Sequence, residues 1–227
     1  MIRVHKKGMT WTGRIIYAVW RSLFLFIFRV VFRTRLVGRD RVPRSGGLLV
    51  VCNHISWADP PMLAVALPRP VEFMTMVEVF RIPVVGVLAR QMGEFPVDRS
   101  RPDAGAAREA VRRVRAGHCV GLFPEAGIRL TEKSVLGGQP EFKPGAGLIA
   151  LLGGAPILPV VIRDTRKPYM WRNWLPFREG RLCRAMMSVT FGCPFCLWIP
   201  ESLPTAERRR LAREVLRAEL LKTIELN

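Results

Sequence analysis

The sequence predicts an α/β fold: a single domain with a largely parallel, mixed sheet flanked by helices and preceded by an N-terminal amphipathic helical segment. Short, continuous apolar runs bounded by turn residues, such as Leu48–Cys52 and Ile157–Ile162, are typical of strands buried on both faces. Helical patterns separate these runs, which favours parallel pairing. The 227 residues, of which 49% are hydrophobic, are enough to bury one sizeable core.

The expected elements follow in chain order. A helix is expected over residues 11–32, and the turn Ser45–Gly47 leads into the first strand, Leu48–Cys52. Asp59-Pro60-Pro61 indicates an N-cap with proline in the first turn of a helix that runs toward Leu67. The remaining elements are a strand at 71–77, helices at 83–92 and 102–116, a strand at 118–123, a helix at 144–152, strands at 157–162 and 186–191, and a final helix from residue 205 that buries Leu211, Val215, Leu216 and Leu220.

The N-terminal segment carries most of the chain's positive charge. Residues 1–44 contain 11 Lys and Arg and one acid, a net charge of +10 out of +18. From Trp11 to Phe32, apolar and aromatic side chains cover most of a helix, and Arg14, Arg21 and Arg29 form a narrow stripe. The uncharged stretches reach only six or seven residues, well short of the ~20 that a membrane-spanning helix needs. We therefore expect a helix, or two short ones, in the headgroup layer with arginines at lipid phosphates. The alternative is a domain helix that packs inward.

The positive charge suits an anionic membrane surface, a nucleic acid or a polyanionic substrate. The aromatic residues form a continuous apolar surface and not isolated stacking platforms, which favours a membrane and argues against nucleic acid. Five cysteines, an odd number, indicate a reduced, cytoplasmic setting. The pair Cys193 and Cys196 has no second pair nearby, so no metal site is expected. We expect a peripheral or monotopic protein on the cytoplasmic face of the membrane.

Asn53-His54-Ile55-Ser56-Trp57-Ala58-Asp59 follows directly on the first buried strand, where α/β folds place reactive groups. A histidine serves as general base when a carboxylate accepts its Nδ1 proton and fixes the tautomer. A tight loop that enters a helix would bring His54 and Asp59 together. The sequence therefore predicts an acid–base pair at this strand end.

Four segments, in order along the chain, resemble the motifs of the glycerolipid acyltransferases. The matching segments are Asn53-His54 with Asp59 (the NHxxxxD motif), Gly93–Arg99 (the second motif, which ends in arginine), Phe123-Pro124-Glu125 (the start of FPEGTR) and Ile157–Val160 (the proline-centred fourth motif). Phe142–Ala146 matches a further segment of the family. The resemblance spans residues 36–200, and four ordered motifs are far more specific than one.

The resemblance implies transfer of a fatty acyl group from acyl-CoA or acyl-ACP to the free hydroxyl of lysophosphatidate, forming phosphatidate without a metal or other cofactor. His54 would be the general base and Asp59 would orient it. The implied substrate-binding residues are Asn53, Arg99, Glu125, Gly127, Arg129 and Lys143. The implied partners are a lysophospholipid acceptor, acyl-CoA or acyl carrier protein and an anionic membrane surface, with no nucleic acid. Residues 1–35 would anchor the protein and residues 36–227 would form the catalytic domain.

One departure from the family pattern keeps other acceptors open. Where the family has Gly-Thr-Arg after Phe-Pro-Glu, this chain has Ala126-Gly127-Ile128-Arg129, so the arginine lies one position later. Glycerol 3-phosphate, another lysophospholipid or a lyso-aminolipid are therefore alternative acceptors. From another class, a non-catalytic basic protein that binds membranes or nucleic acid would explain the charge. Such a protein would have no need of a base and its orienting carboxylate.

Two of the implied substrate ligands also have purely structural interpretations. Arg99 could pair with Asp98 or Asp103 on a solvated loop. Glu125 could be favoured at a helix N-terminus by the helix dipole.

Overall fold

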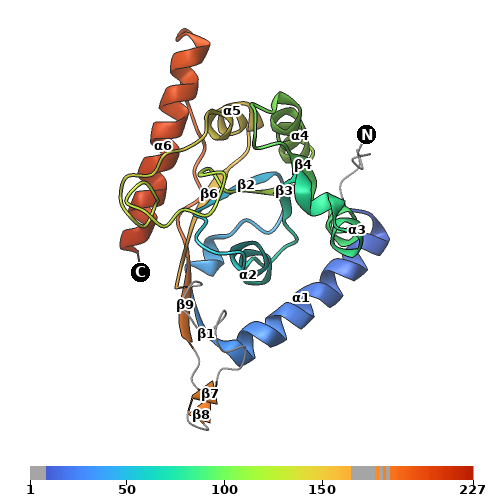
Figure 1. The fold of residues 1–227 in the computed structure, drawn as a ribbon. Coiled ribbons are helices and arrows are strands. Elements are labelled where there is room, and N and C mark those ends of the chain that lie inside the picture. Colours follow the sequence, from blue (N-terminus) through green and yellow to red (C-terminus); the bar gives the residue numbers. More distant parts are fainter. Residues whose placement is uncertain (1–8, 165–176, 179–180, 183–184, 227) are drawn as a thin grey trace.

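The computed structural model describes residues 9–164, 177–178, 181–182 and 185–226, so the first eight residues of the expected anchoring segment and Cys183 lie outside the described residues. Its centre is a seven-stranded sheet in the order β1-β9-β6-β2-β5-β3-β4 (Figure 1). The strands are β1 Phe32–Val37, β2 Leu48–Cys52, β3 Glu72–Met76, β4 Phe95–Val97, β5 Cys119–Leu122, β6 Ile157–Arg163 and β9 Ala185–Phe191. All neighbours pair in parallel except β6 and β9, which are antiparallel. The predicted fold class is confirmed.

Helices cover both faces of the sheet (Figure 1). They are α1 Trp11–Val31, α2 Asp59–Ala66, α3 Pro83–Gln91, α4 Ala104–Arg115, α5 Pro144–Gly153 and α6 Thr205–Glu225, with short 3-10 turns η1 Arg39–Arg41 and η2 Val77–Arg81. A separate hairpin joins β7 Phe177–Arg178 and β8 Arg181–Leu182.

The central strand β2 shows how the two layers form. Successive side chains of a strand point to opposite faces, so Leu48, Val50 and Cys52 pack into the cluster with α1 and α2. Leu49 and Val51 pack into the second cluster, under α4, α5 and α6. All five side chains are buried, which explains why the sequence of this strand is continuously apolar. Strand β2 is thereby a firmly packed support for the segment that follows it.

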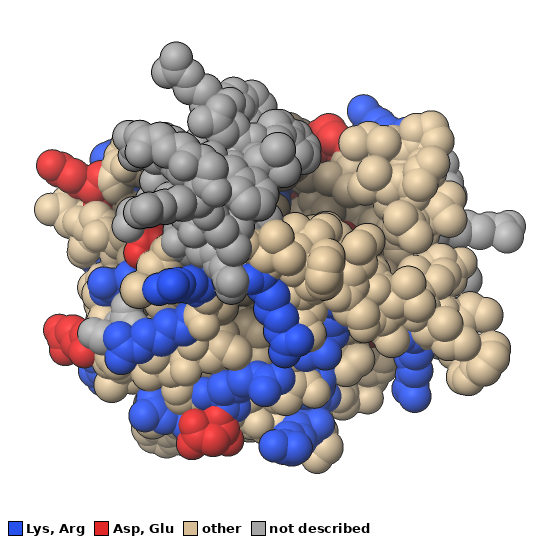
Figure 2. All heavy atoms as spheres, turned by 90° about the horizontal axis from the view of Figure 1, so that it is seen from below, with Lys and Arg blue, Asp and Glu red and all other residues tan. Residues whose placement is uncertain are grey.

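Helix α1 presents two different faces. Tyr17 and Phe28 are buried against α2 and the sheet, with Trp20 and Phe24 partly buried beside them. The opposite face leaves large apolar side chains in solvent: Trp11, Ile15, Val19, Leu23, Phe26, Ile27 and Val30. Seen from below, a broad area without charged side chains lies beside a gathering of Lys and Arg (Figure 2). Among the described residues, no helix has the length and apolar character to cross a bilayer.

The arginines of the predicted stripe do not all point in the same direction. Arg21 points inward, where its guanidinium donates to the carbonyl oxygens of Ala64, Val65 and Leu67 at 3.0–3.3 Å. These carbonyls lie at the C-terminal end of α2, where unpaired C=O groups and the helix dipole favour a cation. The expectation that all the stripe's arginines face lipid phosphates is therefore wrong for Arg21.

Other local expectations also need correction. Asp59 is the first residue of α2 and not its N-cap, which is Ala58. Strands β1 and β4 were not expected, and β1 begins at Phe32, where the sequence indicates helix. In α6, Leu216 and Leu220 are buried as predicted, whereas Leu211 and Val215 are only partly buried.

Candidate active site

The loop after β2 brings His54 and Asp59 into direct contact. Nδ1 of His54 lies 2.9 Å from Oδ2 of Asp59, as the spacing predicts. The same oxygen accepts the backbone N–H groups of Ile55 at 2.6 Å and Ser56 at 2.7 Å. Asp59 also opens α2, so the helix dipole favours its negative charge. A carboxylate held in this way is fixed as the acceptor for the imidazole.

The imidazole of His54 is packed on one face. It stacks on Phe123 with ring centroids 4.4 Å apart, and Phe123 stacks in turn on Phe73. His54 is 5% exposed and Asp59 is completely buried. Because a carboxylate can only accept, Nδ1 donates to Asp59, and in a neutral imidazole Nε2 is then the acceptor nitrogen.

Asn53 joins β2 to β6. Its Nδ2 donates to the carbonyl oxygen of Ile162 at 2.9 Å, and its Oδ1 accepts the N–H of Ile162 at 2.7 Å. The side chain is completely buried. The amide of Asn53 therefore ties the end of β2 to β6, and its expected contact with substrate stays a prediction.

Glu125 joins the His54 loop to the third motif. Its Oε2 accepts the N–H of His54 at 3.0 Å, and its Oε1 accepts the N–H of Val135 at 2.7 Å. Glu125 is completely buried, and this desolvation raises the pKa of its carboxyl above the ordinary value. No helix begins at this residue, so the helix-terminus interpretation is wrong. The carboxylate holds two backbone amides, and its expected contact with substrate stays a prediction.

The altered third motif keeps an unusual backbone conformation. Ala126 has a φ of 52°, in the left-handed region that glycine occupies at little cost and alanine does not. Three residues on, the N–H of Arg129 donates to the carbonyl oxygen of His54 at 2.8 Å. The space beside the Cα of Gly127 is open. The displaced arginine thus remains attached to the His54 loop through its backbone.

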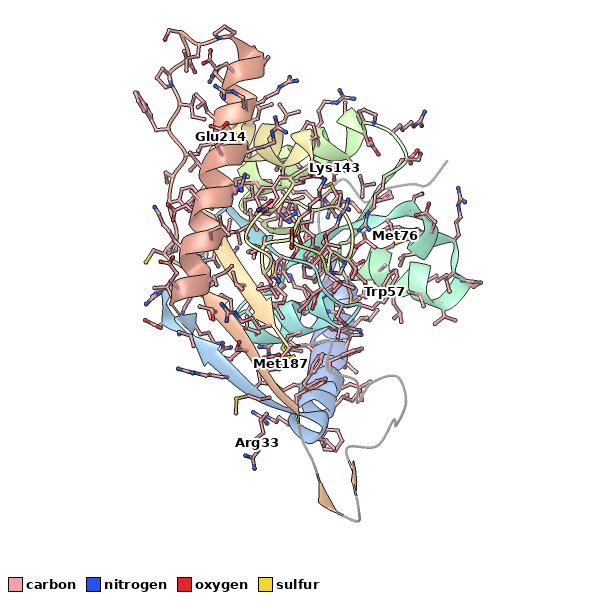
Figure 3. All side chains as sticks on the ribbon, turned by 60° about the vertical axis from the view of Figure 1, so that its left-hand side comes forward. Arg33, Trp57, Met76, Lys143, Met187 and Glu214 are labelled. Carbon is pink, nitrogen blue, oxygen red and sulfur yellow. The ribbon has the colours of Figure 1, made fainter. Side chains whose placement is uncertain are left out.

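Three cationic side chains from the predicted set are exposed: Arg99, Arg129 and Lys143. Lys143 precedes α5, and its N–H donates to Pro124 (Figure 3). Arg99 does not pair with Asp98, which binds Arg101 and Ser100, nor with Asp103, which caps α4. Within the part of the chain that the structure describes, the Arg99 guanidinium forms no hydrogen bond or ion pair, so its donors are available to a ligand.

In the described ranges, no three His, Cys, Asp or Glu side chains gather so that they could hold a metal ion. Burial raises the pKa of Cys52, next to Asn53, well above the ordinary thiol value. A thiol in that state is a poor nucleophile. Cys52 is therefore poorly suited to act as a nucleophile at this strand end.

Comparison with known proteins agrees with this geometry. The family model "Acyltransferase" matches residues 33–163. The 1-acyl-sn-glycerol-3-phosphate acyltransferase of Bacillus subtilis (strain 168) is 30% identical over 183 residues, which are 80% of this chain and 83% of that protein. The protein of the same name from Borreliella burgdorferi is 29% identical over 63% of this chain and 55% of that one.

A solved structure has the same fold. The crystal structure of the 1-acyl-sn-glycerophosphate acyltransferase PlsC from Thermotoga maritima matches with a TM-score of 0.62 and 22% identity, over 94% of this chain and 79% of that chain. Together with the family match over more than half of the chain, these findings show that this protein belongs to the acyltransferase family and is an acyltransferase.

Proposed function

We propose that the protein transfers a fatty acyl group from acyl-CoA or acyl-ACP to the free hydroxyl of lysophosphatidate, forming phosphatidate. The observation that carries this proposal is the buried His54–Asp59 pair at the end of β2, with Nε2 of His54 free to accept a proton. The acceptor is inferred from the names of the relatives. The donor follows from the chemistry, because a thioester is already activated for attack by an alcohol.

The reaction needs one proton relay. Nε2 of His54 takes the proton of the acceptor hydroxyl as its oxygen bonds to the thioester carbonyl carbon. Asp59 stabilises the imidazolium through Nδ1–H. The intermediate then collapses, the carbon–sulfur bond breaks and the imidazolium returns the proton to the leaving thiolate. Positioned proton transfer of this kind contributes about 10²–10⁴-fold in rate.

We further propose that the acceptor phosphate is bound by cations at the same edge of the sheet. Strands β2, β5, β3 and β4 are parallel neighbours, so the segments that follow them, including His54 and Arg99, leave the sheet at one edge. The planar fork of an arginine matches two phosphate oxygens at once. We assign Arg99 as the main phosphate ligand, with Arg129 and Lys143 beside it.

The acceptor assignment can be tested by a product assay. The purified protein is offered labelled acyl-CoA or acyl-ACP with lysophosphatidate, glycerol 3-phosphate, a neutral lysophospholipid and a lyso-aminolipid. We expect the fastest transfer to lysophosphatidate, with phosphatidate as the product. Faster transfer to another acceptor would overturn the assignment, and no transfer with any pair would overturn the reaction.

We also propose that the protein docks on the cytoplasmic face of an anionic membrane. The outer side of α3 adds Ile82, Val84, Val85 and Val87, 44–72% exposed, to the apolar face of α1, and Trp57 is 70% exposed in the His54 loop (Figure 3). Residues 9–35 and 79–93 together contain seven arginines and no acid. Apolar insertion stabilises the bound state by about 25 cal/mol per Å² and is not screened by salt, whereas each arginine near an anionic surface adds about 1 kcal/mol that salt weakens.

Vesicle sedimentation tests the docking surface. Because Trp20 and Phe24 are partly buried, the informative variant is Val19→Ser/Phe26→Ser, whose side chains are 65% and 66% exposed. We expect this variant to lose the salt-resistant part of binding to anionic vesicles. Leu152→Ser, at an exposed leucine of α5, is the matched control and should bind normally. Equal binding by wild type and the α1 variant would overturn the docking proposal.

A further inference from the structure

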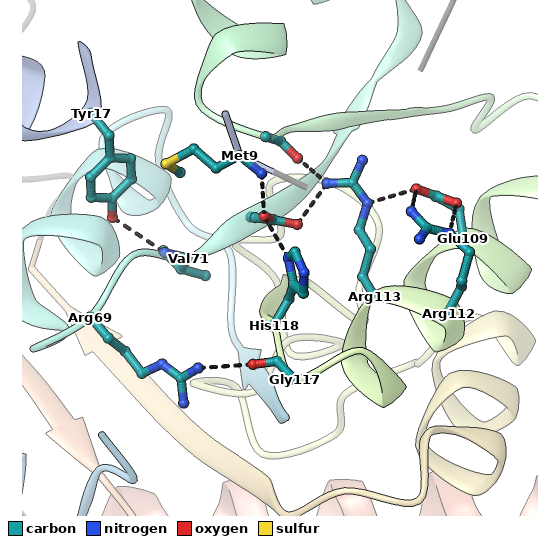
Figure 4. Close-up of polar contacts among 11 residues, drawn as sticks. Met9, Tyr17, Arg69, Val71, Glu109, Arg112, Arg113, Gly117 and His118 are labelled. Atoms are coloured by element: carbon teal, nitrogen blue, oxygen red, sulfur yellow. Dashed lines mark hydrogen bonds and ion pairs between the residues drawn. The ribbon is translucent and has the colours of Figure 1, made fainter. Parts of the chain in front are cut away.

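A second buried polar cluster lies at the beginning of β3 and β5 (Figure 4). Its centre is Arg113 of α4, 1% exposed, with Glu72 of β3, 4% exposed. Nη1 of Arg113 donates to Oε2 of Glu72 at 2.7 Å. The other carboxylate oxygen of Glu72 accepts the N–H of Met9 at 3.2 Å and pairs with Nδ1 of His118 at 2.9 Å. Burying ionised groups is costly even when they are paired. A contribution to stability alone therefore does not explain why these charged groups are buried together.

The cluster contacts the first residues of the second motif. Nη1 of Arg113 also donates to the carbonyl oxygen of Gly93, and its guanidinium carbon lies 4.5 Å from the ring centroid of Phe95. Gly93 has a φ of +82°, and a Cβ there would lie 3.0 Å from the Glu72 carboxylate. Arg113 and Glu72 therefore fix both the conformation and the position of the residue at which the motif begins.

Helix α4 also holds the far end of the motif. The N–H of Asp98 donates to Oδ2 of Asp103, the N-cap of α4, at 3.1 Å. Arg113, in the last turn of the same helix, holds Gly93. Between these two points lie Glu94 and the three residues of β4, which pairs with β3 so that Phe95 is opposite Met74. The residue after Asp98 is Arg99, so α4 sets the place from which Arg99 leaves the sheet.

We infer that Arg113 is a positioning residue for the acceptor phosphate: it seats Gly93 and Phe95 so that Arg99, at the other end of β4, meets the headgroup. The inference rests on the proposed function, in which Arg99 binds that phosphate. A lysine could satisfy one of the acceptors around Arg113, but it has neither the fork nor the flat face that covers Phe95.

The test is a double-mutant cycle on acyl transfer with Arg113→Lys, Arg99→Ala and the double variant. Arg112→Lys is the matched control, because Arg112 shares the partner Glu109 with Arg113 but, among the described residues, has no hydrogen bond to the second motif. A misplacement of about 1 Å can cost up to about 10²-fold. We expect Arg113→Lys to raise the acceptor KM about tenfold, with the donor KM near that of Arg112→Lys.

The cycle also separates this inference from the proposed function. If Arg113 acts through Arg99, the double variant should have the acceptor KM of Arg99→Ala alone. Additive effects, or equal effects of Arg113→Lys on donor and acceptor KM, would overturn the positioning role. If Arg99→Ala itself leaves the acceptor KM unchanged, the phosphate role of Arg99 in the proposed function is wrong. If Arg113→Lys does not fold, Gly93→Ala is the second variant, because its Cβ would displace the backbone of Gly93 from the Glu72 carboxylate. The inference requires that this variant raise the acceptor KM more than the donor KM.

Discussion

The backbone N–H of His54 donates to the buried carboxylate of Glu125, 3.0 Å away and 71 residues further along the chain. The carbonyl oxygen of His54 accepts the N–H of Arg129. His54 is thus held at both of its peptide groups by the third motif and at its ring by Asp59. Positioning of this kind is what general-base catalysis requires.

Glu125→Gln should damage this arrangement. A carboxamide has one acceptor oxygen, so the N–H of either His54 or Val135 would face an NH₂ group. We expect the free energy of unfolding to fall by about 1–3 kcal/mol and turnover to fall about tenfold or more. Denaturant unfolding and acyl-transfer assays measure these effects. Glu132→Gln, at an exposed residue of the same loop, is the control, and equal behaviour of the two variants would refute the role of Glu125.

Asn53→Asp tests the link between β2 and β6. The change replaces the Nδ2 donor by an oxygen that faces the carbonyl of Ile162, now 2.9 Å from Nδ2. Loss of the donor in a fully buried site should lower the free energy of unfolding by about 2–4 kcal/mol. Chemical denaturation measures this change. A variant as stable as wild type would mean that the Asn53 amide is not needed to hold the strand end.

Ala126→Gly should stabilise the protein. Alanine in a left-handed conformation costs about 1–2 kcal/mol, and the φ of 52° at this residue is positive. Glycine is also more flexible in the unfolded chain, which offsets part of this stabilisation. We therefore expect the free energy of unfolding to rise by about 0.5–1 kcal/mol. Ala218→Gly, on the exposed side of α6, should instead destabilise by about 1 kcal/mol. Thermal melts compare the two variants, and destabilisation by Ala126→Gly would contradict the strained turn.

Glu94, inside the second motif, should make stability depend on pH. Desolvation raises its pKa from 4.5 to about 7, and a hydrogen bond from Thr75 opposes the shift. The folded protein therefore binds the proton more tightly than the unfolded chain. The stability from this group is complete below pH 4.5 and is lost as the pH rises to about 7. Glu94→Gln should flatten this part of the stability–pH curve measured by denaturant unfolding. An unchanged curve would show that Glu94 does not titrate in this range.

Most of the fold could be predicted from the sequence, because the buried strands are continuous apolar runs. Leu48–Cys52 and Ile157–Arg163 are examples, since both of their faces meet helices. Strand β1 could not be predicted in this way. Its sequence, Phe32–Val37, contains two arginines and continues the pattern of α1, and its partner β9 lies about 150 residues away. An edge strand of this kind is specified by its neighbour and not by its own hydrophobicity.

The site could be predicted only where side chains act on one another locally. The spacing of His54 and Asp59 predicts their contact, because five residues fit one tight loop. Asn53 and Glu125 lie beside His54, but their hydrogen bonds to the backbone could not be predicted from the sequence. Both bind backbone groups, of Ile162 and Val135, whose positions depend on distant strands and loops. No sequence pattern distinguishes a carboxylate that binds substrate from one that binds two amides.

The proton transfer by His54 is the central claim, and its most direct test is the rate of acyl transfer to lysophosphatidate by His54→Ala. With the fold verified by circular dichroism, we expect a loss of at least about 10²-fold. Asp59→Asn should be nearly as harmful, because the amide would leave the imidazole in the wrong tautomer. A folded His54→Ala protein with turnover near that of wild type would contradict the account.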